Sequence, residues 1–291
     1  MTKFFSAGLV HLHLGVVLMG LTGLFGKLIA QSPITITSLR GLSCFLLLFF
    51  VLAKKKRLSK IKLRLVLSVI PPSLVYGAHF ITFFHSVQVS GVGLGTIAFT
   101  TFPFFVIFLE PLIFGGKINP RNILLTLLMI CGVYLIVPSF SLEDKMFVGI
   151  AWGILSGFLF ALNLLIIRKS LKSSDPITVT FLQTFFYGIL LLPFSELSPG
   201  NYSWNDILYL SLLGFLCTGV GITLINSSMR TVMVQTVAIT IGLEAFYAVI
   251  FAYLWIGETM TPLAMLGGVL IVITGALVTY LESKSKKIVI L

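Results

Sequence analysis

The sequence predicts an all-α polytopic membrane protein, with ten transmembrane helices arranged as two inverted repeats of five helices. Composition is the first reason, because 57% of the 291 residues are hydrophobic and only 10% are charged, with a mean hydropathy of +1.09. No water-soluble core can cover that much apolar surface. The other two reasons are the regular spacing of long apolar runs and a phrase of sequence that occurs twice.

Each apolar run is long enough to cross a ~30 Å hydrocarbon core as a helix. The predicted spans cover residues 11–31, 34–53, 65–87, 93–115, 122–139, 146–167, 177–194, 206–228, 234–256 and 263–281. The connections are short, and we expect neither a removable signal peptide nor a folded domain outside the membrane. The three cysteines fall within spans at unrelated positions, so we expect no disulfide framework and no metal site. Function must therefore reside among the helices.

Positive charge alternates between the connecting segments. If the N-terminus is cytoplasmic, segments on that side hold seventeen of the twenty lysines and arginines, and the opposite segments hold only Lys145. This bias follows the positive-inside rule and predicts that both termini are cytoplasmic, in a bacterial inner membrane. The cluster "KKKRLSKIKLR" at 54–64 is interpreted as a loop against anionic lipid, in preference to a nucleic-acid patch.

The stretch "SPITITSLRG" at 32–41 recurs as "DPITVTFLQT" at 175–184, with Arg40 replaced by Gln183. With nearly the same offset, "FGGKINP" at 114–120 lies over "IGETMTP" at 256–262. The repeat predicts two halves, residues 1–143 and 144–291, of five spans each. Because five is odd, the second half must cross the membrane in the opposite orientation. Transporters use this design to open a central site to each side in turn.

Two stretches resemble a known family. "LFGKLIAQSPITITSLRGLSCFLLL" resembles the opening of an EamA domain, and "IGLEAFYAVIFAYLWIGETMTPLAMLGGVLIVITGALV" resembles its closing signature, which runs from Glu244 to Gly257-Glu258. The resemblance spans nearly the whole chain in two copies and implies the drug/metabolite transporter superfamily. It implies a central cavity lined mainly by helices 1, 3, 4, 6, 8 and 9. The first copy departs from the pattern with "FGGK" in place of a glycine-glutamate pair, and Ala245 stands where proline usually follows the glutamate.

Ionisable side chains within the membrane are rare and costly, so each is a functional candidate. Glu244 is expected near the bilayer midplane, either as a cation or proton site or as a carboxyl hydrogen-bonded to a neighbouring helix. Lys27 and Arg40 are expected in the outer leaflet, where they either face an approaching anion or snorkel to the headgroups. We favour snorkelling for Lys27 and function for Arg40. Glu110 is expected to form an interfacial ion pair near Lys117 and Arg121.

Span 3 carries an aromatic stripe. Tyr76, His79, Phe80 and Phe83 share one helix face, which either packs against a neighbour or lines a cavity. Because span 3 lines the cavity in the resembled fold, we favour contact with an organic substrate. The complete set of predicted substrate-binding residues is Tyr76, His79, Phe80, Phe83, Phe99, Phe102, Asn163, Glu244, Arg40 and Lys27.

Small residues predict close helix packing in span 6. Gly149, Gly153, Gly157 and Ala161 form a ridge that lets another backbone approach. Pro103 is expected to kink span 4.

The favoured function is a secondary transporter of a small organic metabolite, because the chain has no nucleotide-binding domain. An amino acid or amino-acid-like solute is the first candidate, and an S-adenosylmethionine-like solute or a nucleobase or nucleotide is the alternative. An intramembrane enzyme is disfavoured because no catalytic motif is found, and a lipid-linked carrier or structural subunit is a further alternative. We expect no catalytic residue, cofactor or metal. The expected partners are a small-molecule substrate, membrane lipids and coupled protons, with no nucleic acid, and the protein is expected to be a monomer or homodimer.

Overall fold

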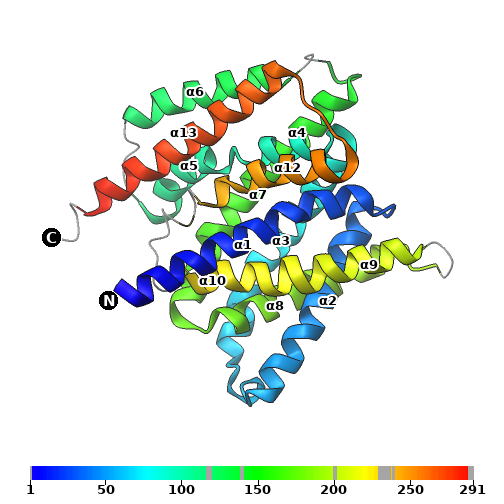
Figure 1. Ribbon diagram of the computed structural model, residues 1–291. Coiled ribbons are helices and arrows are strands. Elements are labelled where there is room, and N and C mark those ends of the chain that lie inside the picture. The colour runs from blue at the N-terminus through cyan, green and yellow to red at the C-terminus, as the bar shows by residue number, and fades with distance from the viewer. Residues whose placement is uncertain are drawn as a thin grey trace.

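The computed structural model describes residues 2–115, 120–137, 141–198, 202–228, 237 and 240–287, and the statements below concern these residues. Their regular structure is helical (Figure 1). The helices are α1 (Thr2–Leu28), α2 (Pro33–Lys54), α3 (Leu63–Ser90), α4 (Val92–Phe99), α5 (Phe102–Phe114), α6 (Pro120–Ile136), α7 (Lys145–Ser173), α8 (Pro176–Leu191), α9 (Trp204–Leu212), α10 (Thr223–Ser228), α12 (Glu244–Ile256) and α13 (Pro262–Lys287). A π-helix, η3 (Leu213–Ile222), joins α9 to α10, and the short 3-10 helices η1 (Leu58–Lys60) and η2 (Leu192–Phe194) lie between longer elements.

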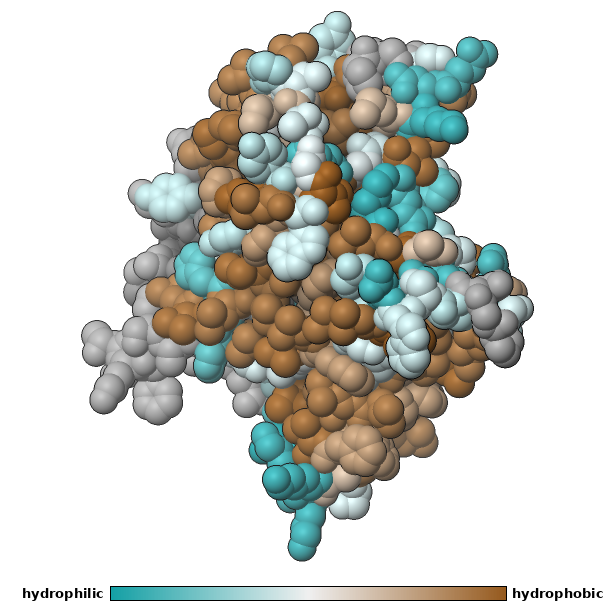
Figure 2. Space-filling view, turned by 45° about the vertical axis from the view of Figure 1, so that its right-hand side comes forward, coloured by the Kyte–Doolittle hydropathy of each residue, from teal (hydrophilic) through white to brown (hydrophobic). Residues whose placement is uncertain are grey.

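The helices occupy the predicted spans in order. Seven helical stretches of the described chain are long and apolar enough to cross a membrane. Three shorter apolar helices, Leu127–Ile136, Thr240–Ile256 and Pro262–Thr274, fall in the remaining predicted spans. The all-α polytopic fold is therefore confirmed. Figure 2 shows a face whose middle is largely hydrophobic, as expected of helices that contact lipid.

Span 4 is interrupted, as Pro103 predicts. α4 ends at Phe99 and α5 begins at Phe102, because a proline early in α5 removes a helical N–H and pushes against the preceding turn. The span that ends in α12 has a similar turn at Leu243, just before Glu244. α5 and α12 have the same length of 13 residues. Both are followed by a glycine with positive φ, Gly115 at 78° and Gly257 at 65°.

The predicted glycine ridge on α7 is confirmed as a packing surface. A Cβ atom added at Gly153 would lie 2.7 Å from the Cβ of Ala98, and one at Gly157 would lie 2.8 Å from the carbonyl oxygen of Phe99. The Ser86 hydroxyl of α3 donates to the Gly149 carbonyl at 2.7 Å. α7 therefore packs backbone to backbone against α4, and this contact fixes the position of α4 in the bundle.

The π-helix η3 lies against α2. The Thr218 hydroxyl donates to the Leu213 carbonyl five residues earlier, at 2.8 Å. Gly214 permits the close contact, since a Cβ atom there would lie 2.5 Å from the Cβ of Ser43 and 3.0 Å from the Arg40 carbonyl oxygen. Such wide turns inside membrane helices occur frequently at functional sites.

Polar contacts tie the helices together at the end of the bundle where α1 ends and α4 begins. The two Glu258 carboxylate oxygens accept the backbone N–H groups of Val92 at 3.0 Å and Gly93 at 2.8 Å. The Asp206 carboxylate at the start of α9 accepts the backbone N–H of Ala30 at 2.9 Å. Helices from both halves of the sequence are therefore joined at this end.

Candidate functional site

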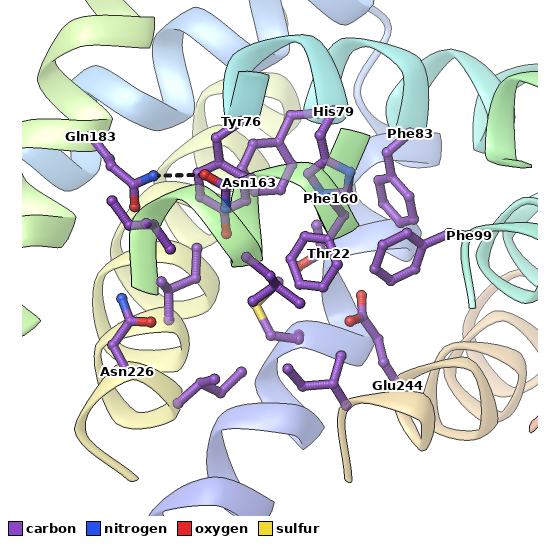
Figure 3. A pocket seen from close by; sticks show the side chains of 17 residues that line it. Thr22, Tyr76, His79, Phe83, Phe99, Phe160, Asn163, Gln183, Asn226 and Glu244 are labelled. Atoms are coloured by element: carbon purple, nitrogen blue, oxygen red, sulfur yellow. Dashed lines mark hydrogen bonds between the residues drawn. The ribbon is translucent and has the colours of Figure 1, made fainter. Parts of the chain in front are cut away.

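A cavity lies in the middle of the bundle (Figure 3). Its lining residues come from α1, α3, α4, α7, α8, η3, α10, the segment that leads into α12, and α12 itself. They are Met19, Thr22, Tyr76, His79, Phe80, Phe83, Phe99, Phe160, Asn163, Leu164, Ile167, Gln183, Ile222, Ile225, Asn226, Ile241 and Glu244. Apart from Gln183, these residues belong to predicted spans 1, 3, 4, 6, 8 and 9, the helices that the family resemblance implies.

The structure brings most of the predicted substrate-binding residues together around this cavity. Those that line it are Tyr76, His79, Phe80, Phe83, Phe99, Asn163 and Glu244. Lys27, Arg40 and Phe102 do not line it.

One side of the cavity is an aromatic wall, which we define as Tyr76, His79, Phe80, Phe83, Phe99 and Phe160. The Tyr76 and His79 rings stack with centroids 5.6 Å apart, and His79 lies 5.3 Å from Phe99. Phe99 and Phe160 meet edge to face at 5.2 Å. The stripe of span 3 thus packs against its neighbours and also faces the cavity. A wall of this kind suits the ring or alkyl part of an organic solute.

His79 is hydrogen-bonded to Ser156 of α7 within this wall. Its Nδ1 lies 3.1 Å from the Ser156 carbonyl oxygen and 2.8 Å from the Ser156 hydroxyl. Both contacts hold Nδ1 against α7, so the position of the His79 ring in the wall is fixed by Ser156.

Glu244 is the acidic group of the cavity. It is the first residue of α12, and its side chain is 4% exposed. Figure 3 shows its carboxyl group directed toward Phe99 and Phe160. Within the described part of the chain it makes neither a hydrogen bond nor an ion pair, so the hydrogen-bonded alternative raised by the sequence is not observed there. Its place at a helix N-terminus favours a negative charge.

Side-chain amides lie on the other side of the cavity from Glu244, as Figure 3 shows. The Gln183 amide donates to the Asn163 side-chain oxygen at 3.0 Å, and the Asn226 amide donates to the Thr180 hydroxyl at 2.8 Å. Sequence reasoning missed Gln183 and Asn226 as cavity residues. Gln183 had one signal, its equivalence to Arg40 in the repeat.

Arg40 lies behind the aromatic wall. It is fully buried, and its Nε and Nη2 donate to the Thr218 hydroxyl of η3 at 3.0 Å and 2.7 Å. Its guanidinium carbon lies 3.7 Å from the centroid of the Phe80 ring. Arg40 therefore does not snorkel, and Phe80 separates it from the cavity.

The remaining candidates have local partners. Lys27 donates to the backbone carbonyl of Gln88 near the end of α3, at 2.7 Å. Phe102 forms a second layer, with its ring 5.0 Å from that of Phe160. Glu110 pairs with Arg168 of α7 at 3.1 Å. The predicted ion pair thus exists with a different cation, while Lys117 and the Arg121 side chain lie outside the described residues.

A family model described as "EamA-like transporter family" matches residues 6–137 and again residues 147–281. The chain belongs to the EamA-like transporter family. This EamA-family protein is 27% identical over 270 residues to an "Uncharacterized transporter" of Archaeoglobus fulgidus, covering 92% of the chain and 94% of that relative. It is 23% identical over 292 residues to "Uncharacterized transporter YxxF" of Bacillus subtilis, covering 97% and 92%.

A solved crystal structure has the same fold, with a TM-score of 0.66 at 11% identity over 96% of this chain and 98% of the other. Family membership and the membrane-spanning helices together make this EamA-family chain an integral membrane transporter.

Proposed function

We propose that the protein is a secondary transporter that moves an amino acid or an amino-acid-like solute. The observation that carries this proposal is the Glu244 carboxyl, which has no partner among the described residues and faces an aromatic wall inside the membrane. A buried carboxylate needs a compensating cation, and the ammonium group of an amino acid supplies one. The aromatic wall accommodates an apolar side chain and also attracts the cation.

Alternating access is proposed as the mechanism, with residues 1–143 and 144–291 as the inverted halves. The family model matches once in each half, which supports this division. Two interrupted spans reach the cavity, one through Phe99 and the other through Glu244. Interrupted helices at the centre of the membrane are typical of secondary transporters. A coupled proton is the second ligand proposed for Glu244.

The proposed orientation has both termini in the cytoplasm of a bacterial cell. The count of lysine and arginine supports it, and it makes the end held by Glu258 and Asp206 the outer end. Alkaline phosphatase fused after Leu291 should be inactive, and a fluorescent protein at the same site should fluoresce. Active phosphatase at this position would contradict the orientation.

Uptake by proteoliposomes tests the function. Purified protein should accumulate at least one labelled L-amino acid out of the twenty, and that amino acid should raise the melting temperature in proportion to the logarithm of its concentration. S-adenosylmethionine and adenine belong in the same screen, because the aromatic wall also suits a purine ring. Vesicles that accumulate none of the twenty amino acids and no S-adenosylmethionine would refute the proposal.

A further inference from the structure

Two buried polar atoms behind the aromatic wall have no hydrogen-bond partner among the described residues. They are Nη1 of Arg40 and the hydroxyl oxygen of Tyr187. Both side chains are almost completely buried, at 0% and 1% exposure. Buried donors without partners are rare because their desolvation is not compensated. Two such donors, both on side chains that contact Phe80, are available to a ligand group.

Both residues contact the same ring of the wall. The Arg40 guanidinium carbon lies 3.7 Å from the Phe80 centroid, and the Tyr187 ring lies 6.0 Å from it. Tyr187 also packs against Gly41, the neighbour of Arg40, where any Cβ atom would collide with the tyrosine ring. Phe80 itself lines the cavity. Phe80 therefore contacts both the cavity and the two side chains that carry the donors, and Tyr187 also meets Tyr76 of the wall edge to face at 6.1 Å.

The charges of this region do not pair with each other. Arg40 makes no ion pair among the described residues, where the ion pairs found join Arg57 to Asp175 and Arg168 to Glu110. Glu244, the acid of the cavity, likewise makes no ion pair within the part of the chain that the structure describes. Around the aromatic wall, the described residues thus include a positive group, Arg40, and a negative group, Glu244, that do not contact each other. A solute with an ammonium and a carboxylate group would complement both, whereas an amine would complement only Glu244.

We propose that Arg40 Nη1 and the Tyr187 hydroxyl bind the carboxylate of a zwitterionic solute when Phe80 rotates out of the way, while the ammonium group lies at Glu244. This inference rests on the proposed function and specifies its substrate class. A guanidinium and a phenol are both suited to donate to a carboxylate, and the guanidinium gives the stronger, charge-assisted bond. The contact with Thr218 uses only Nε and Nη2, so it accounts for the position of the guanidinium and leaves Nη1 available.

Matched pairs of ligands test this proposal. Binding of L-phenylalanine and phenethylamine, and of L-lysine and cadaverine, should be measured on the purified protein by thermal shift and calorimetry. Each pair differs chiefly in the carboxylate. The wild-type protein should prefer the amino acid by at least about ten-fold, as expected for a charge-assisted hydrogen bond.

Two variants remove the proposed donors. Arg40→Gln, which copies Gln183 of the second half, and Tyr187→Phe should both lower the preference for the amino acid toward one-fold without changing the affinity for the amine. Phe80→Leu, which removes the separating ring, should raise the affinity for the amino acid alone. Arg168→Gln is the matched control, since it removes another arginine that contacts neither Phe80 nor the cavity, and it should leave the preference unchanged.

The outcomes separate this inference from the proposed function. If the protein binds amino acids but Arg40→Gln and Tyr187→Phe keep the full preference, the carboxylate site is refuted and the proposed function stands. Wild-type protein that binds the amine as tightly as the amino acid would refute the site in the same way. If the Arg40 variant does not fold, the ligand preference of Tyr187→Phe and the amino-acid affinity of Phe80→Leu test the carboxylate site instead. If neither an amino acid nor S-adenosylmethionine binds, the proposed function itself is refuted, and the carboxylate site with it.

Discussion

Two glutamates stand at the two ends of α12, and their surroundings are opposite. Glu244 begins the helix and directs its carboxyl group into the cavity, where none of the described residues pairs with it. Glu258 follows the helix, and both of its oxygens accept backbone N–H groups at the start of α4. α4 connects the two, because Val92 at its first position meets Glu258 and Phe99 at its last position faces the cavity with Glu244.

The difference teaches that one sequence motif can contain both a structural acid and an acid available to a ligand. The negative charge of Glu258 is stabilised by two backbone N–H groups at the N-terminus of α4, where such groups have no partner within the helix. Among the described residues, Glu244 has the N-terminus of its own helix and an aromatic wall beside it, and neither is a cation, so a bound ligand can supply the partner for its charge. Gly116 occupies the position equivalent to Glu258 in the first half, and it lies outside the described residues.

Displacing α4 should have the largest effect on stability, because α4 connects the surroundings of the two glutamates. Gly153→Leu should lower the free energy of unfolding by about 3 kcal/mol, because the new side chain must fit between the backbones of α7 and α4. The yield of folded protein and its melting temperature measure the effect. Leu155→Ala on the exposed side of the same helix is the control and should change little. Normal stability of Gly153→Leu would mean that the ridge is not a required contact.

Replacing the cavity acid should affect transport and spare the fold. We expect Glu244→Gln to transport at least about 30-fold more slowly, since loss of one partner of a buried charge pair costs about 2 kcal/mol or more. Its melting temperature should match that of the wild type, and the pH profile of the residual transport should be flat. Wild-type rates with an unchanged pH profile would show that Glu244 is a packing residue.

Replacing the second glutamate should have the reverse effect. Glu258→Ala removes two charge-assisted hydrogen bonds at a partly exposed site, so we expect a loss of about 1–2 kcal/mol in the free energy of unfolding. Affinity for the transported amino acid should change by less than about two-fold, because the carboxylate does not reach the cavity. Glu143→Ala, which removes an exposed acid, is the control. A large loss of affinity with unchanged stability would exchange the roles assigned to the two glutamates.

Glu110 is a third acid, and we expect its replacement to have the smallest effect. Glu110 pairs with Arg168 at 3.1 Å, and both side chains are partly exposed. Glu110→Gln should cost less than about 1 kcal/mol and leave transport unchanged, because exposed ion pairs contribute little. Equilibrium unfolding at low and high salt checks this, and a loss of transport would show that the pair belongs to the transport cycle.

The large features of the fold could be predicted from the sequence. Long apolar runs predict the spans, and Pro103 predicts the kink in span 4. The glycine spacing on α7 predicts a close backbone contact, but the structure was needed to identify α4 as the partner. The break at Leu243 was not predicted, because Ala245 stands where the family usually has proline and leaves no local signal. The π-helix was also missed, since no residue pattern distinguishes it from an ordinary apolar helix.

The candidate site was harder to predict for a physical reason. A membrane helix is apolar on the lipid side and on the packed side, so hydrophobicity does not tell which face points inward. A polar residue deep in a span marks a candidate, as with Asn163 and Glu244. It does not tell whether the side chain faces the cavity, as Gln183 does, or a neighbouring ring, as Arg40 does. That depends on tertiary packing.

The π-helix between α9 and α10 also determines the direction in which the side chains after it point. In an α-helix each residue turns the side-chain direction by about 100°, and a wider turn shifts the direction of everything that follows. Ile225 and Asn226 line the cavity directly after this segment. Had η3 been wound as an α-helix from Leu213 onward, these side chains would point elsewhere. The direction in which the Asn226 amide faces is therefore decided upstream, at the wide turn that Thr218 closes.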